Sequence, residues 1–163
     1  MGPGVCRVTV AIDPGDDTGW SKWLDRRLVA CGLTHPDAYP ELPFTIGLPT
    51  DGLDLVVENP EAYSGDRKVD PNKLITLGRK VGELIGVYRA YYHLLGKPFT
   101  WEIVLPKRWK GQVPKPIHHD RHLPTLDAAE QRVLLASLET VPNGMRHDVK
   151  DSVCLGLWRV KRT

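Results

Sequence analysis

The sequence predicts an α/β domain, and three observations support this prediction. Three short strand-like segments follow one another near the N-terminus. A fourth such segment precedes a long stretch in which apolar residues recur at helical spacing, and the C-terminal third is mainly helical in pattern. The 163 residues suit one domain with one hydrophobic core, so we expect residues 1–163 to fold as a single unit.

The composition is that of an ordinary globular protein, with 41% hydrophobic and 26% charged residues. No apolar run approaches the roughly 20 residues that span a bilayer, and the N-terminus lacks the shape of a signal peptide. We therefore expect a cytoplasmic protein with no membrane partner. The three cysteines are too far apart for a disulfide framework or a zinc pair, and we expect them to be buried as small apolar side chains.

The first predicted strand ends on a carboxylate. Residues 8–12 are apolar and mostly β-branched, which is typical of a buried strand, and Asp13 follows. A Pro-Gly pair then turns the chain, and residues 20–23 alternate large and polar side chains as a second strand does. A buried carboxylate is costly unless something pairs with it. Asp13 is therefore either a turn-capping residue or a carboxylate that handles a metal or a phosphate.

The next segments extend the predicted sheet. Residues 28–33 indicate a third strand, and the short connections favour an antiparallel meander of the first three strands. After a proline-rich loop, residues 44–48 indicate a short edge strand. Residues 53–58 form another apolar strand that ends on an acid, Glu58, as the first strand ends on Asp13. A long polar loop follows it, of a kind that often carries binding residues.

Residues 70–95 predict a long helix. Asp70 is a capping residue, Pro71 suits the first helical position, and Gly96 closes the segment. Gly78, Gly82 and Gly86 lie four residues apart, so they share one face of this helix. Since each glycine weakens a helix by about 1 kcal/mol, we expect this face to pack closely against a sheet or another helix.

The C-terminal part contains another strand, a basic loop and further helices. Residues 99–104 indicate the strand, residues 106–116 the loop, and residues 117–139 one or two helices. The last helix begins near His147 and carries Asp148 and Asp151, which lie three residues apart on one face. These two acids either stabilise the helix N-terminus through its dipole or belong to a functional site.

Positive charge gathers between residues 107 and 122, although the whole chain carries only +2. This window holds five basic residues and one acid, and so a formal charge of +4. It is either a solvated loop or a set of phosphate contacts. The basic candidates are Lys107, Arg108, Lys110, Lys115 and Arg121. The window also holds His118, His119 and His122, which lack a nearby cysteine for zinc, so we expect surface or phosphate-facing histidines. Among the five tryptophans, we expect Trp109 to contact DNA and the other four to lie in the core.

Four carboxylates converge if the first and fourth strands are neighbours and the last helix crosses their ends. Together they would repel one another strongly in a partly buried site. Divalent cations relieve such repulsion, because Mg²⁺ prefers hard oxygen ligands. Two such ions roughly 4 Å apart activate a water and stabilise a leaving oxygen. The sequence thus favours a metal site formed by Asp13, Glu58, Asp148 and Asp151.

Three motifs, in order, resemble the RuvC-type Holliday junction resolvases of the ribonuclease H-like nuclease superfamily, in particular the compact, phage-encoded branch. They are Ile-Asp-Pro-Gly-Asp-Asp-Thr-Gly at residues 12–19, Val-Val-Glu-Asn-Pro at residues 56–60, and His-Asp-x-x-Asp-Ser-x-x-Leu-Gly at residues 147–156. The resemblance implies a mixed five-stranded sheet, with its first three strands antiparallel, flanked by helices. It also implies a metal-dependent homodimer that resolves four-way DNA junctions by paired symmetric nicks, in the cytoplasm of the host cell if the protein is phage-encoded.

The resemblance implies roles for particular residues. Asp13 matches the first-strand acid that bridges two Mg²⁺ ions, for which Mn²⁺ substitutes, and Glu58 matches the fourth-strand acid. His147 is either a ligand or proton shuttle, or a helix-capping residue. No small-molecule cofactor is implied. In the polar loop, Tyr63 is either a base-stacking residue at the crossover or an ordinary loop tyrosine. The other implied DNA contacts in that loop are Arg67 and Lys68.

Three other functions compete with this interpretation. Actin-like ATPases share the fold core, but they need two lobes and a second phosphate loop, which this chain lacks. Another ribonuclease H-like nuclease, acting on RNA–DNA hybrid or RNA, would use nearly the same acids. A non-catalytic DNA-binding protein is disfavoured, because four acids without a metal would cost stability.

Overall fold

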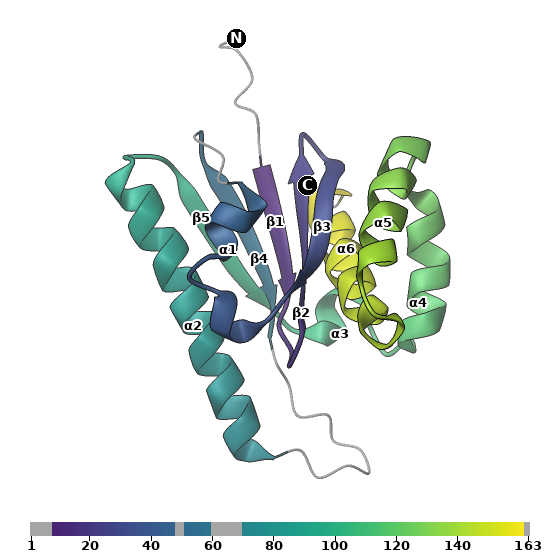
Figure 1. The fold of residues 1–163 in the computed structure, drawn as a ribbon, viewed down its shortest axis with the longest axis horizontal. Coiled ribbons are helices and arrows are strands. Elements are labelled where there is room, and N and C mark those ends of the chain that lie inside the picture. Colours follow the sequence, from purple (N-terminus) through teal and green to yellow (C-terminus); the bar gives the residue numbers. More distant parts are fainter. Residues whose placement is uncertain (1–7, 48–50, 60–69, 162–163) are drawn as a thin grey trace.

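A computed structural model describes residues 8–47, 51–59 and 70–161 (Figure 1). Its core is one five-stranded sheet of order β3-β2-β1-β4-β5. The strands β1 (Val8–Asp13), β2 (Thr18–Leu24) and β3 (Arg27–Thr34) are antiparallel, whereas β4 (Leu53–Glu58) and β5 (Phe99–Val104) run parallel to β1. This is the mixed α/β sheet of a ribonuclease H-like fold, so the predicted fold class is confirmed.

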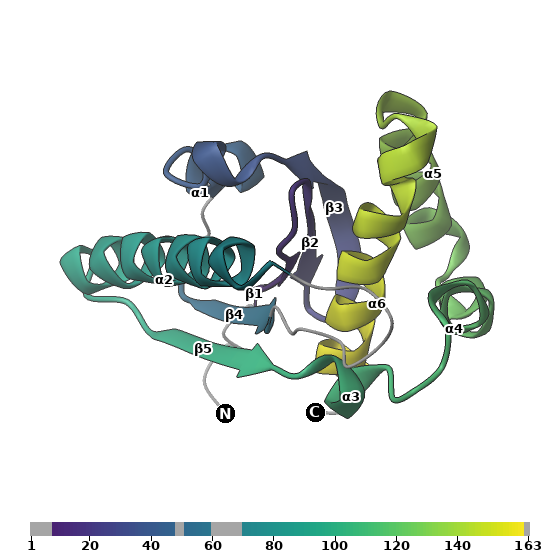
Figure 2. The same ribbon diagram turned by 90° about the horizontal axis from the view of Figure 1, so that it is seen from below.

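Helices cover both faces of the sheet. The long helix α2 (Pro71–Leu94) lies on one face and α6 (Arg146–Lys161) on the other, with α5 (Ala128–Thr140) beside β3 (Figure 2). Within the described residues, no helix is both long and apolar enough to span a membrane. The shorter helices are η1 (Pro36–Ala38), α1 (Leu42–Ile46), α3 (Pro106–Trp109), α4 (Lys115–His122), η2 (Leu123–Thr125) and η3 (Asn143–Met145).

The alternation of side chains along β1 and β4 separates the core from the candidate site. Successive strand residues point to opposite faces, so residues 8, 10 and 12 of β1 and residues 53, 55 and 57 of β4 join the core under α2. The intervening residues face α6, where Ala11 and Val56 are fully buried. Asp13 and Glu58 are the last residues of these strands and therefore lie on the α6 face.

The helix α6 packs directly on β2 because two glycines leave room for it. A Cβ added at Gly19 would lie 1.9 Å from the Asp148 carbonyl oxygen, and one at Gly156 would lie 2.0 Å from Nε1 of Trp23. Ser21 reinforces this contact by donating a 2.8 Å hydrogen bond to the Ser152 carbonyl. The sequence pattern did not reveal these two close approaches.

Within the described residues of this one chain, the glycine row of α2 packs against neither the sheet nor another helix, contrary to the expectation. A Cβ at Gly78, Gly82 or Gly86 would meet no atom within 4 Å, so this face of α2 is open. The helix instead buries a different face, where Val81, Leu84, Tyr88 and Tyr92 join the core. The apolar stripe, not the glycine stripe, therefore determines which face of α2 contacts the sheet.

The edge strand expected at residues 44–48 is also wrong, because the chain forms the helix α1 there. Leu42 and Ile46 are both buried and lie four residues apart, which is the helical spacing. The expected loop at residues 106–116 likewise begins with a short helix, α3. Trp101 was expected in the core, but it lies on the edge strand β5 with 47% of its surface exposed.

Candidate active site

Asp13 and Glu58 lie side by side at the ends of two parallel strands. They directly follow Ile12 and Val57, which are paired across β1 and β4. Both acids are buried, with 7% and 8% of their surfaces exposed. Glu58 accepts hydrogen bonds from Nε1 of Trp109 at 2.7 Å and from Nζ of Lys110 at 3.2 Å. By contrast, no group in the described chain donates a hydrogen bond to Asp13.

The first turns of α6 bring two more acids to this end of the sheet. Gly19, which contacts the backbone at Asp148, is the residue of β2 that pairs with Asp13. Asp151 lies one turn further along α6 and is almost fully buried, with 1% of its surface exposed. Asp148 is partly buried, and its Oδ1 lies 3.1 Å from Nε2 of the exposed His147.

Asp13, Glu58 and Asp151 lie close enough that their charges influence one another. Burial raises the pKa of Asp13 well above its ordinary value, and the charges of Glu58 and Asp151 raise it further, against the opposing effect of Lys115 and Lys110. Burial also raises the pKa of Glu58, although Lys110 and Trp109 partly offset it. Without a bound metal ion, Asp13 and Glu58 therefore ionise less readily than ordinary carboxyl groups.

Asp151 has the opposite shift because it is well supplied with partners. Burial alone would raise its pKa, but a hydrogen bond with Nε2 of His119 at 2.7 Å and an ion pair with Lys115 lower the pKa to about 2. Asp148 has a raised pKa, mainly because of burial, with His147 opposing the shift. Asp151 is therefore the acid that stays ionised most readily.

The segment from α3 to α4 supplies all four of these partners. Trp109 and Lys110 contact Glu58, and Lys115 and His119 contact Asp151. The expectation that Trp109 faces DNA is not met, because its indole is 6% exposed and bonds to Glu58. His118 and His119, which were expected to face the surface or a phosphate, are likewise buried. The sequence analysis did not identify Trp109 and His119 as partners of the acids. The requirement of buried carboxylates for hydrogen-bond donors could have suggested that such partners exist.

The donor chemistry of the site fits a divalent cation. Four carboxylates are hard oxygen ligands, and the buried Asp13 lacks any donor in the described chain. Within the described residues, however, no three His, Cys, Asp or Glu side chains are arranged closely enough to hold a metal. Instead, Lys110 and Lys115 pair with Glu58 and Asp151. Metal binding and these two ion pairs therefore use the same carboxylate groups.

The remaining predicted DNA contacts are not brought into the acid cluster. Lys107 and Arg121 are exposed, whereas Arg108 forms an ion pair with Glu102 on β5. Lys110 and Lys115 lie inside the acid cluster and pair with its carboxylates. In this structure they are therefore not arranged as the phosphate contacts that were predicted. Three predicted contacts lie outside the described residues: Tyr63, Arg67 and Lys68.

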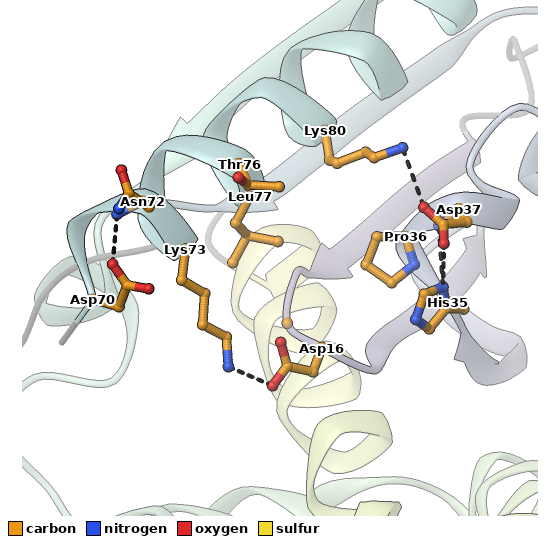
Figure 3. Close-up of a pocket in the computed structure, with 11 residues that line it drawn as sticks. Asp16, His35, Pro36, Asp37, Asp70, Asn72, Lys73, Thr76, Leu77 and Lys80 are labelled. Atoms are coloured by element: carbon orange, nitrogen blue, oxygen red, sulfur yellow. Dashed lines mark hydrogen bonds and ion pairs between the residues drawn. The ribbon is translucent and has the colours of Figure 1, made fainter.

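A separate hollow lies between α2 and the turn that follows β1 (Figure 3). It measures about 550 Å³, and its two lysines are already neutralised. Lys73 forms a 2.5 Å ion pair with Asp16, and Lys80 lies 3.3 Å from Asp37. Because its charges are paired internally, this hollow offers no net attraction to an anion, and the candidate site remains the acid cluster.

The fold and the cluster together define a ribonuclease H-like domain with buried acids at the ends of β1 and β4. No protein-family model matches the sequence, and no curated protein matches it. Among solved structures, the chain is similar to RuvC of T. thermophilus, determined in complex with a Holliday junction substrate. The two are 15% identical with a TM-score of 0.46, over 93% of this chain and 91% of that one.

Proposed function

We propose that this protein is a divalent-metal-dependent nuclease that resolves four-way DNA junctions. The observation that carries the proposal is the Asp13 carboxylate, which is buried beside Glu58 and Asp151 without a donor in the described chain. A structural acid would normally be hydrogen-bonded or exposed. A carboxylate held in an acid cluster without a hydrogen-bond donor in the described chain is instead the arrangement that a cation completes.

The four acids would hold two Mg²⁺ ions, and Mn²⁺ would substitute. The bound ions would supply an activated water and stabilise the leaving oxygen of a phosphodiester. Trp109 fixes the orientation of Glu58, and His119 fixes that of Asp151. Lys110 and Lys115, which pair with Glu58 and Asp151 in this structure, would give up these carboxylates to the ions. His147 is exposed beside Asp148 and is placed to exchange a proton with solvent.

Junction DNA is the proposed substrate because of the three sequence motifs at residues 12–19, 56–60 and 147–156. The paired symmetric nicks of a resolvase need two active sites, so the proposal includes a homodimer. The other candidate substrate is an RNA–DNA hybrid, which a nuclease of the same superfamily would cut with a similar acid set. The choice of substrate is therefore what the experiment must decide.

The test offers the purified protein a synthetic four-way junction, a linear duplex of matched sequence and an RNA–DNA hybrid. We expect paired nicks near the crossover with Mg²⁺, none with a chelator, and none from Glu58→Gln, which should still bind the junction. Cleavage of the hybrid alone would contradict the junction substrate and indicate a nuclease of the same superfamily that acts on RNA–DNA hybrids. Normal cleavage by a well-folded Glu58→Gln would exclude Glu58 as a metal ligand.

Replacing Trp109 with Phe should weaken metal binding while leaving the fold intact. The substitution removes the 2.7 Å hydrogen bond to Glu58 but keeps an aromatic ring in the buried position. Loss of such a supporting contact typically costs about 10–100-fold in metal affinity or activity. Calorimetric titration with Mn²⁺ measures the affinity directly. The matched control is Trp101→Phe on the exposed edge strand, and equal affinities for the two variants would contradict this role.

A further inference from the structure

A basic cavity of about 560 Å³ lies between α4 and the first turns of α6. Its charged lining consists of His119, Asp120, Arg146, His147 and Lys150. The cavity thus combines two permanent cations and two histidines with a single acid. None of the sequence motifs identified these residues as a group, because they come from two helices that are distant in the chain.

The two permanent cations of this cavity are available to a ligand. Within the described part of the chain, neither Arg146 nor Lys150 forms an ion pair. Toward other described residues, Arg146 donates through Nε alone, to the Val141 carbonyl at 3.2 Å, and this contact orients its guanidinium group. Both side chains are half-buried. By contrast, three cations of the predicted basic window are already paired with acids: Arg108, Lys110 and Lys115.

The basic cavity borders the acid cluster on its α6 side. His119 lines the cavity and also contacts Asp151, and His147 lines it and contacts Asp148. A strand whose reacting phosphate lies on the acids would therefore have this cavity as its neighbour on the α6 side. Arg146 and Lys150 are the groups that such a strand would meet there.

We propose that the basic cavity binds a backbone phosphate of the DNA strand, next to the phosphate held at the acid cluster. The guanidinium group of Arg146 suits bidentate recognition of a phosphate, and Lys150 adds a second positive charge. The proposal rests on the proposed function for the identity of the strand. It deepens that function by assigning a substrate contact to α6, outside the predicted basic window.

The test measures binding of a single-stranded thymidine hexamer in the presence of a chelator, at several salt concentrations. The variant is Arg146→Gln with Lys150→Gln, and the matched control is Arg89→Gln with Lys97→Gln, which removes the same charges from exposed positions far along the chain. On single strands each phosphate contact contributes about 0.7 to the slope of log affinity against log salt. Because the cavity holds one phosphate, we expect the cavity variant to lose about 0.7 from this slope, and the control to keep the slope of the unmodified protein.

The outcomes separate this proposal from the proposed function. Equal slopes for the cavity variant and the control would overturn the cavity assignment, even if the protein resolves junctions. A reduced slope for the cavity variant alone would support the assignment, even if the protein cuts another substrate. Amide NMR shifts of residues 143–150 on addition of the hexamer provide a second measurement. Their absence in the unmodified protein would also overturn the proposal, and equal melting temperatures of the two variants show that both are folded.

Discussion

Asp13→Asn should abolish cleavage and, without metal, make the protein more stable. Catalysis should fall by more than about 100-fold, because losing a metal ligand should cost more than the about 10–100-fold that is typical of losing a contact that supports a ligand. Stability should rise because the substitution removes a charge that burial and the neighbouring Glu58 and Asp151 disfavour. At neutral pH, each unit by which the pKa of Asp13 is raised corresponds to about 1.4 kcal/mol, and each kcal/mol to about 2–4 °C in melting temperature for a chain of this size.

The same substitution should change the pH dependence of stability in one direction. The unfolded chain ionises Asp13 near the ordinary value of 3.8, whereas burial and neighbouring charges raise the pKa in the folded protein. Below the unfolded value both states hold the proton, so Asp13 costs no stability. As pH rises from there through the folded pKa, the folded protein loses stability. The advantage of Asp13→Asn should therefore be small near pH 4 and largest at neutral pH.

Thermal melts between pH 4 and 8, with a chelator and then with Mn²⁺, measure both effects. Asp16→Asn is the matched control, because Asp16 lies in the same turn but is exposed and paired with Lys73. The control should cleave normally and melt as the unmodified protein does. We expect Mn²⁺ to stabilise the unmodified protein and the control, but not Asp13→Asn. An Asp13→Asn variant that melts lower than the unmodified protein in chelator would show that the carboxylate has a structural partner.

The positions of the acids could be predicted because they follow from short-range patterns. An apolar β-branched run indicates a strand, and the residue that ends the run lies at an edge of the sheet. This reasoning placed Asp13 and Glu58 at strand ends, and the spacing of three residues placed Asp148 and Asp151 on one face of a helix. Their roles as metal ligands remain a proposal, since the arrangement described here pairs two of them with lysines.

The partners of the acids could not be predicted, because they depend on how a distant segment packs. Trp109 and His119 lie in a stretch that reads as a basic loop followed by a helix. Trp109 is 51 residues from Glu58 in the sequence, and His119 is 32 residues from Asp151. Only the tertiary fold brings each pair into contact. The same limitation applies to Arg146 and Lys150. The cavity that they line with residues of α4 could not be predicted from the sequence around them.

The packing around a glycine could not be predicted from its position in the sequence alone. The regular row in α2 invited the expectation of close packing, yet its face is open. Gly19, by contrast, appeared in the sequence only as the last residue of the motif at residues 12–19, yet it is the point where β2 contacts α6. Spacing along a helix identifies a shared face, but it does not say whether that face is covered, because the apolar stripe of the helix competes for the sheet.

Gly19→Ala should disrupt the candidate site more severely than its small change in volume suggests. The added Cβ would lie 1.9 Å from the Asp148 carbonyl oxygen and 3.0 Å from the Val149 nitrogen, both of which are backbone atoms that no rotamer change can move. The first turn of α6 must therefore shift away from β2, carrying Asp148 with it. Overpacking of this kind costs typically about 1–3 kcal/mol. Since metal ligands must hold their geometry closely, we also expect a loss of Mn²⁺ affinity.

Gly144→Ala is the matched control for this prediction, because it adds the same methyl group just before α6. A Cβ at Gly144 would meet no atom within 4 Å, so this variant should melt and bind Mn²⁺ as the unmodified protein does. Denaturant unfolding gives the stability change and calorimetry gives the metal affinity. If Gly19→Ala lost stability but bound Mn²⁺ normally, Asp148 would not be a ligand, because the shift of α6 moves this acid first. Unchanged stability would instead mean that α6 does not rest on β2 at this point.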